Sequence, residues 1–160
     1  MKKLKRINMH IRQYIDLIHR TQTDLTKAFK VVADAHGDEV DVYQNCMLLS
    51  SWSNTLANNL EPIANRYAKE DDEEPDRLTH TLLKKTRNGG MALLRDLHDL
   101  YLIVTEVQVC CTILKQGGTA LGDEALVTMC DETSRQSKRQ LSWLMTRMKS
   151  AAPQTLIVAQ

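Results

Sequence analysis

The stretch MALLRDLHDLYLIVTEVQVCCTILKQ, residues 91–116, decides the fold of this 160-residue chain. Its apolar residues recur every three to four positions, the spacing that places side chains on one face of an α-helix. This seam consists of Leu93, Leu97, Leu100, Val104, Val107, Cys111 and Leu114. The stretch therefore predicts one α-helix of about 39 Å, at about 1.5 Å per residue.

The same helix carries apolar residues on a second side, namely Leu102, Ile103, Val109, Cys110 and Ile113. One seam cannot bury both sides. The helix therefore either lies deep in its own bundle or presents the second side to another subunit. We expect a homo-oligomer formed through this second side, and a different protein partner is also possible.

Three further segments have helical periodicity, at about residues 5–36, 39–68 and 123–152. Gly37 and Gly122 can end helices in the left-handed conformation, and Asp38 and Asp123 can cap the helices that follow. Pro62 predicts a kink or a break near residues 58–62, because proline lacks a backbone donor and clashes with the preceding turn. Pro153 predicts the end of the last helix.

Residues 69–90 lack this periodicity and begin with the acidic run KEDDEEPDR. The connections are therefore short, long and short. This order predicts one all-α domain over residues 1–160, an antiparallel four-helix bundle of ferritin-like topology with one long crossover between its second and third helices. Residues 153–160 form an apolar tail, which we expect to fold back onto the bundle or to join a partner surface.

Composition excludes several classes of protein. A net charge of +1, with 42% hydrophobic and 26% charged residues, indicates a soluble domain without a membrane span and without a field that attracts nucleic acid. The basic residues Lys2, Lys3, Lys5 and Arg6 fit a solvated helix start. The four cysteines lack metal-site spacing, which favours a reducing, cytoplasmic setting. Nucleotide-binding and hydrolase motifs are missing, so no catalytic residue is predicted.

Three stretches resemble a family of small uncharacterised bacterial proteins with ferritin-like bundles. They are KVVADAHGDEVDVY (residues 30–43), LLRDLHDLYLIVTEVQ (93–108) and WLMTRMKSAAPQTLIV (143–158). The resemblance implies a ferritin-like fold over nearly the whole chain. Di-iron proteins of that fold use a Glu from each of two helices and a Glu-x-x-His from each of the other two.

Those ligands are largely missing. Neither Glu-x-x-His occurs, and the mid-helix seam positions carry Gln22 in the first helix and Ser53 in the second. The remaining candidates for a metal site are Glu106, Glu132 and His98, too few for an intact di-iron centre. No cofactor is therefore expected, and a bound metal ion is the alternative.

Other polar residues have two interpretations each. Glu106 has apolar helical neighbours, so it requires a partner across helices, a proton, or a position at a wet edge. The polar seam of His98, Tyr101, Thr105, Gln108 and Thr112 can line a cavity or pack against a neighbouring helix. His36 fits the negative end of a helix dipole. Alternatively it joins Glu39 and Asp41 in a surface metal site.

The basic patch of Arg135, Lys138, Arg139 and Arg147 is expected to pair with acidic groups rather than with phosphate. We interpret the chain as a non-catalytic, oligomeric binding or interaction module. The alternative is a degenerate or unconventional metal-binding oxidoreductase that uses Glu106, Glu132 and His98. A third hypothesis is a carrier of an apolar small molecule along residues 91–116.

Overall fold

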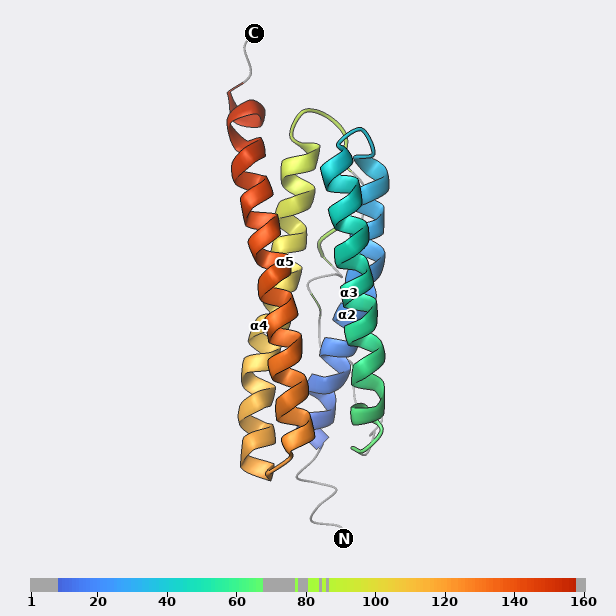
Figure 1. Cartoon of the computed structure of the whole chain (residues 1–160), viewed down its shortest axis with the longest axis vertical. Helices are drawn as coiled ribbons and strands as arrows, with labels where there is room; N and C mark the ends of the chain where they lie inside the picture. Colours follow the sequence, from blue (N-terminus) through green and yellow to red (C-terminus); the bar gives the residue numbers. More distant parts are fainter. Residues whose placement is uncertain (1–8, 68–76, 78–80, 84, 86, 158–160) are drawn as a thin grey trace.

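The computed structural model describes residues 9–67, 77, 81–83, 85 and 87–157. These residues form four helices: α2 (Met9–Ala35), α3 (Val40–Ala64), α4 (Ala92–Leu121) and α5 (Glu124–Leu156). The helices lie side by side with their long axes aligned (Figure 1). The predicted all-α four-helix bundle is confirmed.

The helix directions follow from Figure 1. α2 runs up the page, α3 and α4 run down, and α5 runs up again. The main contacting pairs are α2 with α3, α4 with α5, α2 with α4, and α3 with α5, and each of these four pairs is antiparallel. α3 ends at the lower end of the bundle and α4 begins at the upper end, so their connection spans its length. The antiparallel arrangement with one long crossover is therefore also confirmed.

The core fills the space between the four helices and explains the 3–4 periodicity of the sequence. Phe29 of α2, Leu60 of α3, Leu100 of α4 and Leu144 of α5 are completely buried. Burying one such side chain contributes roughly 1.5–3 kcal/mol relative to leaving it exposed. In α4 the burial extends to Ile103 and Cys110 on the second apolar side. Part of that side therefore faces the chain's own bundle.

α4 is longer than the sequence pattern predicts, since it continues through Gly117 and Gly118 to Leu121. Gly118 is buried against α5, where an added Cβ would lie 3.2 Å from side-chain atoms of Leu126 and Val127. Gly118 lies inside α4, and its lack of a side chain allows α5 to pack closely against α4. The helix ends at Gly122, whose φ of 68° is in the left-handed region.

The two short turns differ in their capping. Asp123 is the N-cap of α5, as predicted, and its carboxylate accepts a hydrogen bond of 3.1 Å from the backbone N–H of Leu126. The N-cap of α3 is Glu39 rather than the predicted Asp38, and its side chain makes no capping hydrogen bond. This turn is closed by backbone bonds instead, such as Glu39 N to His36 O at 3.0 Å.

α3 ends at Ala64, four residues before the predicted end. Pro62 lies inside the helix and does not break it at residues 58–62. Arg12 of α2 stabilises the end of α3, because its guanidinium donates to the carbonyls of Ala64 and, at 2.8 Å, Tyr67. The carbonyl of Ala64 is one of those that a helix end leaves without intrahelical partners.

The prediction that Pro153 ends the last helix is wrong. Pro153 lies within α5, which continues to Leu156. Proline has no backbone N–H to donate to the carbonyl one turn earlier. Because Pro153 is exposed, water can hydrogen-bond to that carbonyl instead. Leu156 and Ile157 are 63% and 81% exposed, so the predicted fold-back of the tail is wrong for these residues. Residues 158–160, the basic N-terminal cluster and the acidic run at 70–74 lie outside the described residues.

Candidate functional site

The middle of the bundle contains a buried layer of neutral polar side chains. Gln22 and Ser53 are completely buried, as their seam positions predict, and Gln140 of α5 is buried with them. The Gln140 amide donates to Leu49 O at 3.1 Å and to Ser53 Oγ at 2.9 Å, which joins α5 to α3. Gln140 was not predicted from the sequence, although it lies in a 3–4 series with the buried Ser137 and Leu144.

The three candidate metal ligands do not converge. His98 and Glu132 are exposed, while Glu106 is half-buried. Glu132 lines a pocket of about 490 Å³ between α3 and α5, together with Asn58, Pro62 and Met129. In the part of the chain that the structure describes, no three side chains of His, Cys, Asp or Glu form a group that could hold a metal ion.

The polar seam of α4 contacts a neighbouring helix through Gln108. Gln108 donates to Ser134 O at 2.6 Å and accepts from Ser134 Oγ at 3.0 Å, so it links α4 to α5. Thr105 and Thr112 donate to carbonyls one turn earlier in α4 itself. His98 faces solvent. The packing interpretation is therefore confirmed for Gln108.

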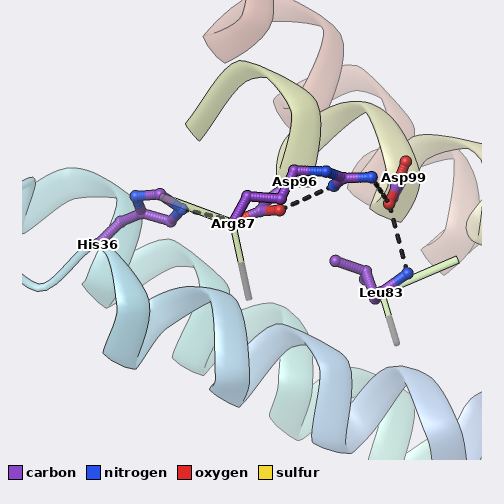
Figure 2. Close-up of polar contacts among 5 residues, drawn as sticks. All are labelled: His36, Leu83, Arg87, Asp96 and Asp99. Carbon is purple, nitrogen blue, oxygen red and sulfur yellow. Dashed lines mark hydrogen bonds and ion pairs between the residues drawn. The ribbon is translucent and has the colours of Figure 1, made fainter. Parts of the chain in front are cut away.

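A charged cluster at the upper end of the bundle joins three parts of the chain (Figure 2). Asp96 and Asp99 project from the first turns of α4, and both are buried. Arg87, from the segment before α4, donates to Asp96 at 2.8 Å and to Asp99 at 2.6 Å. The backbone N–H of Leu83 donates to Asp99 at 3.3 Å. His36 Nε2, from the end of α2, lies 2.8 Å from Asp96 Oδ2.

The cluster holds the end of the crossover and the end of α2 against α4. Burial lowers the pKa of the Arg87 guanidinium, but hydrogen bonds and charge from Asp99 and Asp96 outweigh this, so its pKa lies above the ordinary value. Arg87 is therefore the fixed cation that compensates two buried carboxylates. We call His36, Arg87, Asp96 and Asp99 the Arg87 cluster.

The Arg87 cluster was not predicted from the sequence. The only signal was Asp96 and Asp99, two carboxylates three residues apart beside the apolar residues Leu97 and Leu100, which required compensation. The predicted role of His36 was incomplete, because its ring bonds a carboxylate of another helix. Glu39 and Asp41 do not join it, since they pair with Arg147 of α5 at 3.1 and 2.6 Å.

Two members of the basic patch on α5 have contacts within the chain. Arg147 pairs with the acidic start of α3, and Arg139 lies with its guanidinium carbon 4.5 Å from the ring centre of Trp52. A cation over an indole ring is a favourable arrangement. The predicted pairing with acidic groups is confirmed for Arg147.

The four cysteines are all free and buried. Burial raises the pKa of the Cys46 thiol to about 12, with a contribution from the charge of Asp41. Burial and the nearby Glu106 carboxylate raise the pKa of Cys110 to about 11. Burial likewise raises the pKa of Cys130 to about 12, and that of Cys111. The thiolate is the reactive form, so these thiols are held in an inert state.

We therefore expect the folded protein to react with a thiol reagent at mildly alkaline pH roughly 100-fold more slowly than free cysteine, or slower still. Absorbance with Ellman's reagent measures the rate, and all four thiols should react once urea unfolds the chain. A fast, stoichiometric reaction of the folded protein would contradict the burial of the thiols.

The outward face of α4 departs from the usual pattern of a surface helix. Val109 is 53% exposed, Ile113 is 47% exposed and Leu102 is 38% exposed.

α4 is also long and apolar enough to cross a membrane. Its most apolar stretch of 18 residues has a mean hydropathy of 1.4, but 50% of that stretch is buried inside the bundle. A core helix passes the same test, so this is weak evidence for a membrane span.

Comparisons of the chain with family models, with curated proteins and with solved structures found no significant match. An assignment of function therefore depends on the geometry of this chain alone.

Proposed function

We propose that this protein is a non-catalytic interaction module that associates with a second copy of itself through the outward face of α4. The observation that carries the proposal is the exposure of Leu102, Val109 and Ile113 on one face of that helix. Their spacing of seven and four residues places them in one stripe along the helix. We call these three residues the α4 stripe.

The surroundings of the α4 stripe favour an interface over a solvated surface. Between Leu100 and Leu114, the only charged residue of α4 is Glu106. This stretch spans roughly 21 Å of helix. Surface helices of monomeric proteins usually place charged residues opposite the core, whereas the centres of interfaces are depleted in charge.

Charge also favours a second copy as the partner. The three side chains of the α4 stripe are uncharged, the one carboxylate on the same face, Glu106, is half-buried, and a formal net charge of +1 produces no strong repulsion between two copies. A strongly charged partner would find only the half-buried Glu106 as a charged group on this face. In a two-fold dimer the same patch contacts itself, which requires only that the patch be self-complementary.

Several features support a ferritin-like bundle of cytoplasmic origin as part of this proposal. The four main contacting helix pairs are antiparallel, and one long crossover joins the second and third helices of the four. Four free, buried cysteines fit a reducing compartment. Membership of the bacterial family suggested by residues 30–43, 93–108 and 143–158 belongs to the same proposal.

The test is the double variant Val109→Glu with Ile113→Glu, compared with Leu48→Glu. Leu48 of α3 is 48% exposed, so the control introduces a carboxylate at a site of matching exposure on another helix. Burying two unpaired carboxylates should raise the dimer dissociation constant at least about 100-fold. In analytical ultracentrifugation, the wild type and Leu48→Glu should sediment as oligomers and the double variant as an 18.2 kDa monomer.

Circular dichroism should show the same helical content in all three proteins, because the substituted side chains face away from the core. A wild type that sediments as a monomer at high concentration would refute the proposal. Equal dissociation of Leu48→Glu would also refute it, since the interface would then lie elsewhere or be nonspecific.

Elemental analysis of the same wild-type preparation tests the metal-binding alternative. We expect no stoichiometric iron, manganese or zinc. A bound metal that is lost in Glu106→Ala or Glu132→Ala would instead favour the oxidoreductase interpretation.

A further inference from the structure

Buried polar atoms without hydrogen-bond partners gather at one level of the bundle. They are Thr21 Oγ1, Gln22 Nε2 and Gln22 Oε1 in α2, and Gln136 Oε1, Ser137 Oγ and Gln140 Oε1 in α5. Buried side-chain polar atoms are usually bonded to protein or to ordered water. Six such atoms on two helices therefore require a common explanation.

The register of the helices places these atoms together. Ser50 Oγ donates to Thr26 O at 2.7 Å and so aligns α3 with the antiparallel α2. One turn further from the α2–α3 connection, the same alignment places Gln22 of α2 at the level of Ser53 of α3. Gln140 donates to Ser53 Oγ at 2.9 Å, which brings residues 136–140 of α5 to the same level. α2 and α5 are not among the main contacting pairs, so they lie diagonally across the middle of the bundle.

No direct hydrogen bond joins the orphaned groups to one another. Gln22 alone offers two N–H donors and a carbonyl acceptor, and the hydroxyls of Thr21 and Ser137 each add a donor. A bond between the Gln22 amide and Gln140 Oε1 would still leave Gln22 Oε1, Gln136 Oε1 and both hydroxyls without partners. A molecule that donates and accepts bonds in several directions satisfies all of these groups at once, and water does so.

We propose that this level of the bundle is an internal binding site for water, held by Gln22 from α2 and by Ser137 and Gln140 from α5. The site is neutral, because its members are amides and hydroxyls that carry no charge. Hard divalent cations require several carboxylate or imidazole ligands, so the site selects a neutral guest over a metal ion. This inference does not depend on self-association through α4.

A high-resolution crystal structure of the full chain tests the site, with part of the crystals soaked in zinc chloride. We expect ordered water within hydrogen-bond distance of at least two of the six atoms, and no anomalous zinc signal at this level. Direct pairing of Gln22 with Gln140 without an ordered water would overturn the proposal. Zinc bound among these side chains would also overturn it.

A pair of variants separates the site from ordinary surface hydration. Gln22→Leu has a similar volume and cannot hydrogen-bond, so it should remove the water that Gln22 holds while Gln140 keeps its bond to Ser53. Gln44→Leu, at an exposed position of α3, should leave the buried water in place. Retention of the same water in Gln22→Leu would show that Gln22 does not hold it. If Gln22→Leu does not fold, the wild-type crystals still decide the question.

Discussion

Replacing Arg87 with alanine is expected to lower the free energy of unfolding by about 3 kcal/mol, because two buried carboxylates then lose their cation. The side chains of Asp96 and Asp99 are only 1% and 5% exposed. The Arg87 side chain is itself 32% exposed, so water can partly replace it, and we place the loss at the low end of the range for buried pairs. Urea denaturation followed by circular dichroism measures the change.

Arg95→Ala is the matched control, since Arg95 is an exposed arginine in the turns of α4 that carry Asp96 and Asp99. Its effect should stay within about 0.5 kcal/mol. Adding Asp99→Asn to Arg87→Ala should recover part of the loss, because an amide needs no counter-charge. If Arg87→Ala and Arg95→Ala are equally stable, the Arg87 cluster does not hold the crossover in solution.

Replacing Asp123 with alanine is expected to lower the free energy of unfolding by about 2 kcal/mol. Asp123 caps α5 and also accepts hydrogen bonds from the Tyr67 hydroxyl and, at 3.0 Å, from Arg66. The variant therefore loses a helix cap and leaves the buried phenol of Tyr67 without an acceptor. Asp123→Asn keeps a capping oxygen and should lose less. Equal losses in both variants would show that the charge is what matters.

The same contacts predict how stability depends on pH. Burial raises the pKa of Asp123, but hydrogen bonds from Tyr67 and Leu126 and the charge of Arg66 outweigh this, so its folded-state pKa lies below the ordinary 3.8. Its contribution is complete above that value and is lost as pH falls through the folded-state pKa. Burial and the Asp123 bond raise the pKa of Tyr67 to about 12.

Tyr67 therefore contributes stability fully below its unfolded pKa of about 10, and the contribution is lost as pH rises towards 12. The difference in unfolding free energy between wild type and Asp123→Ala should thus be constant across neutral pH and should shrink in acid. A series of urea titrations at several pH values measures it. A difference that grows in acid would contradict the sign of this linkage.

The fold could be predicted because periodicity reports directly which residues are buried. The seam of residues 91–116 and the weaker seams around it located all four helices, and the long acidic connection predicted the crossover. The helix ends were harder to predict, because they depend on contacts between segments. Gly118 lies within α4 at the point where α5 packs closely against it. Arg12 of α2 donates a hydrogen bond to the last residue of α3.

The polar sites could be predicted only in part, for a related reason. Gln22 and Ser53 stand out as polar residues in apolar seams, so their burial was visible in the sequence. Arg87 lies in a segment without periodicity, and nothing in its neighbourhood indicates that it reaches Asp96 and Asp99. Such a contact depends on how the crossover lies on the bundle, which local sequence does not determine.

The lengthwise crossover also bears on how the chain reaches its native state. α2 with α3, and α4 with α5, are hairpins made of neighbours in sequence, so each can form with little loss of chain entropy. The two halves meet only when the intervening segment closes, and its entropic cost grows slowly with its length. The bundle is therefore expected to open first at the interface between the α2–α3 hairpin and the α4–α5 hairpin. Hydrogen exchange should then show two cooperative units, with the Arg87 cluster at the boundary that separates before either hairpin unravels.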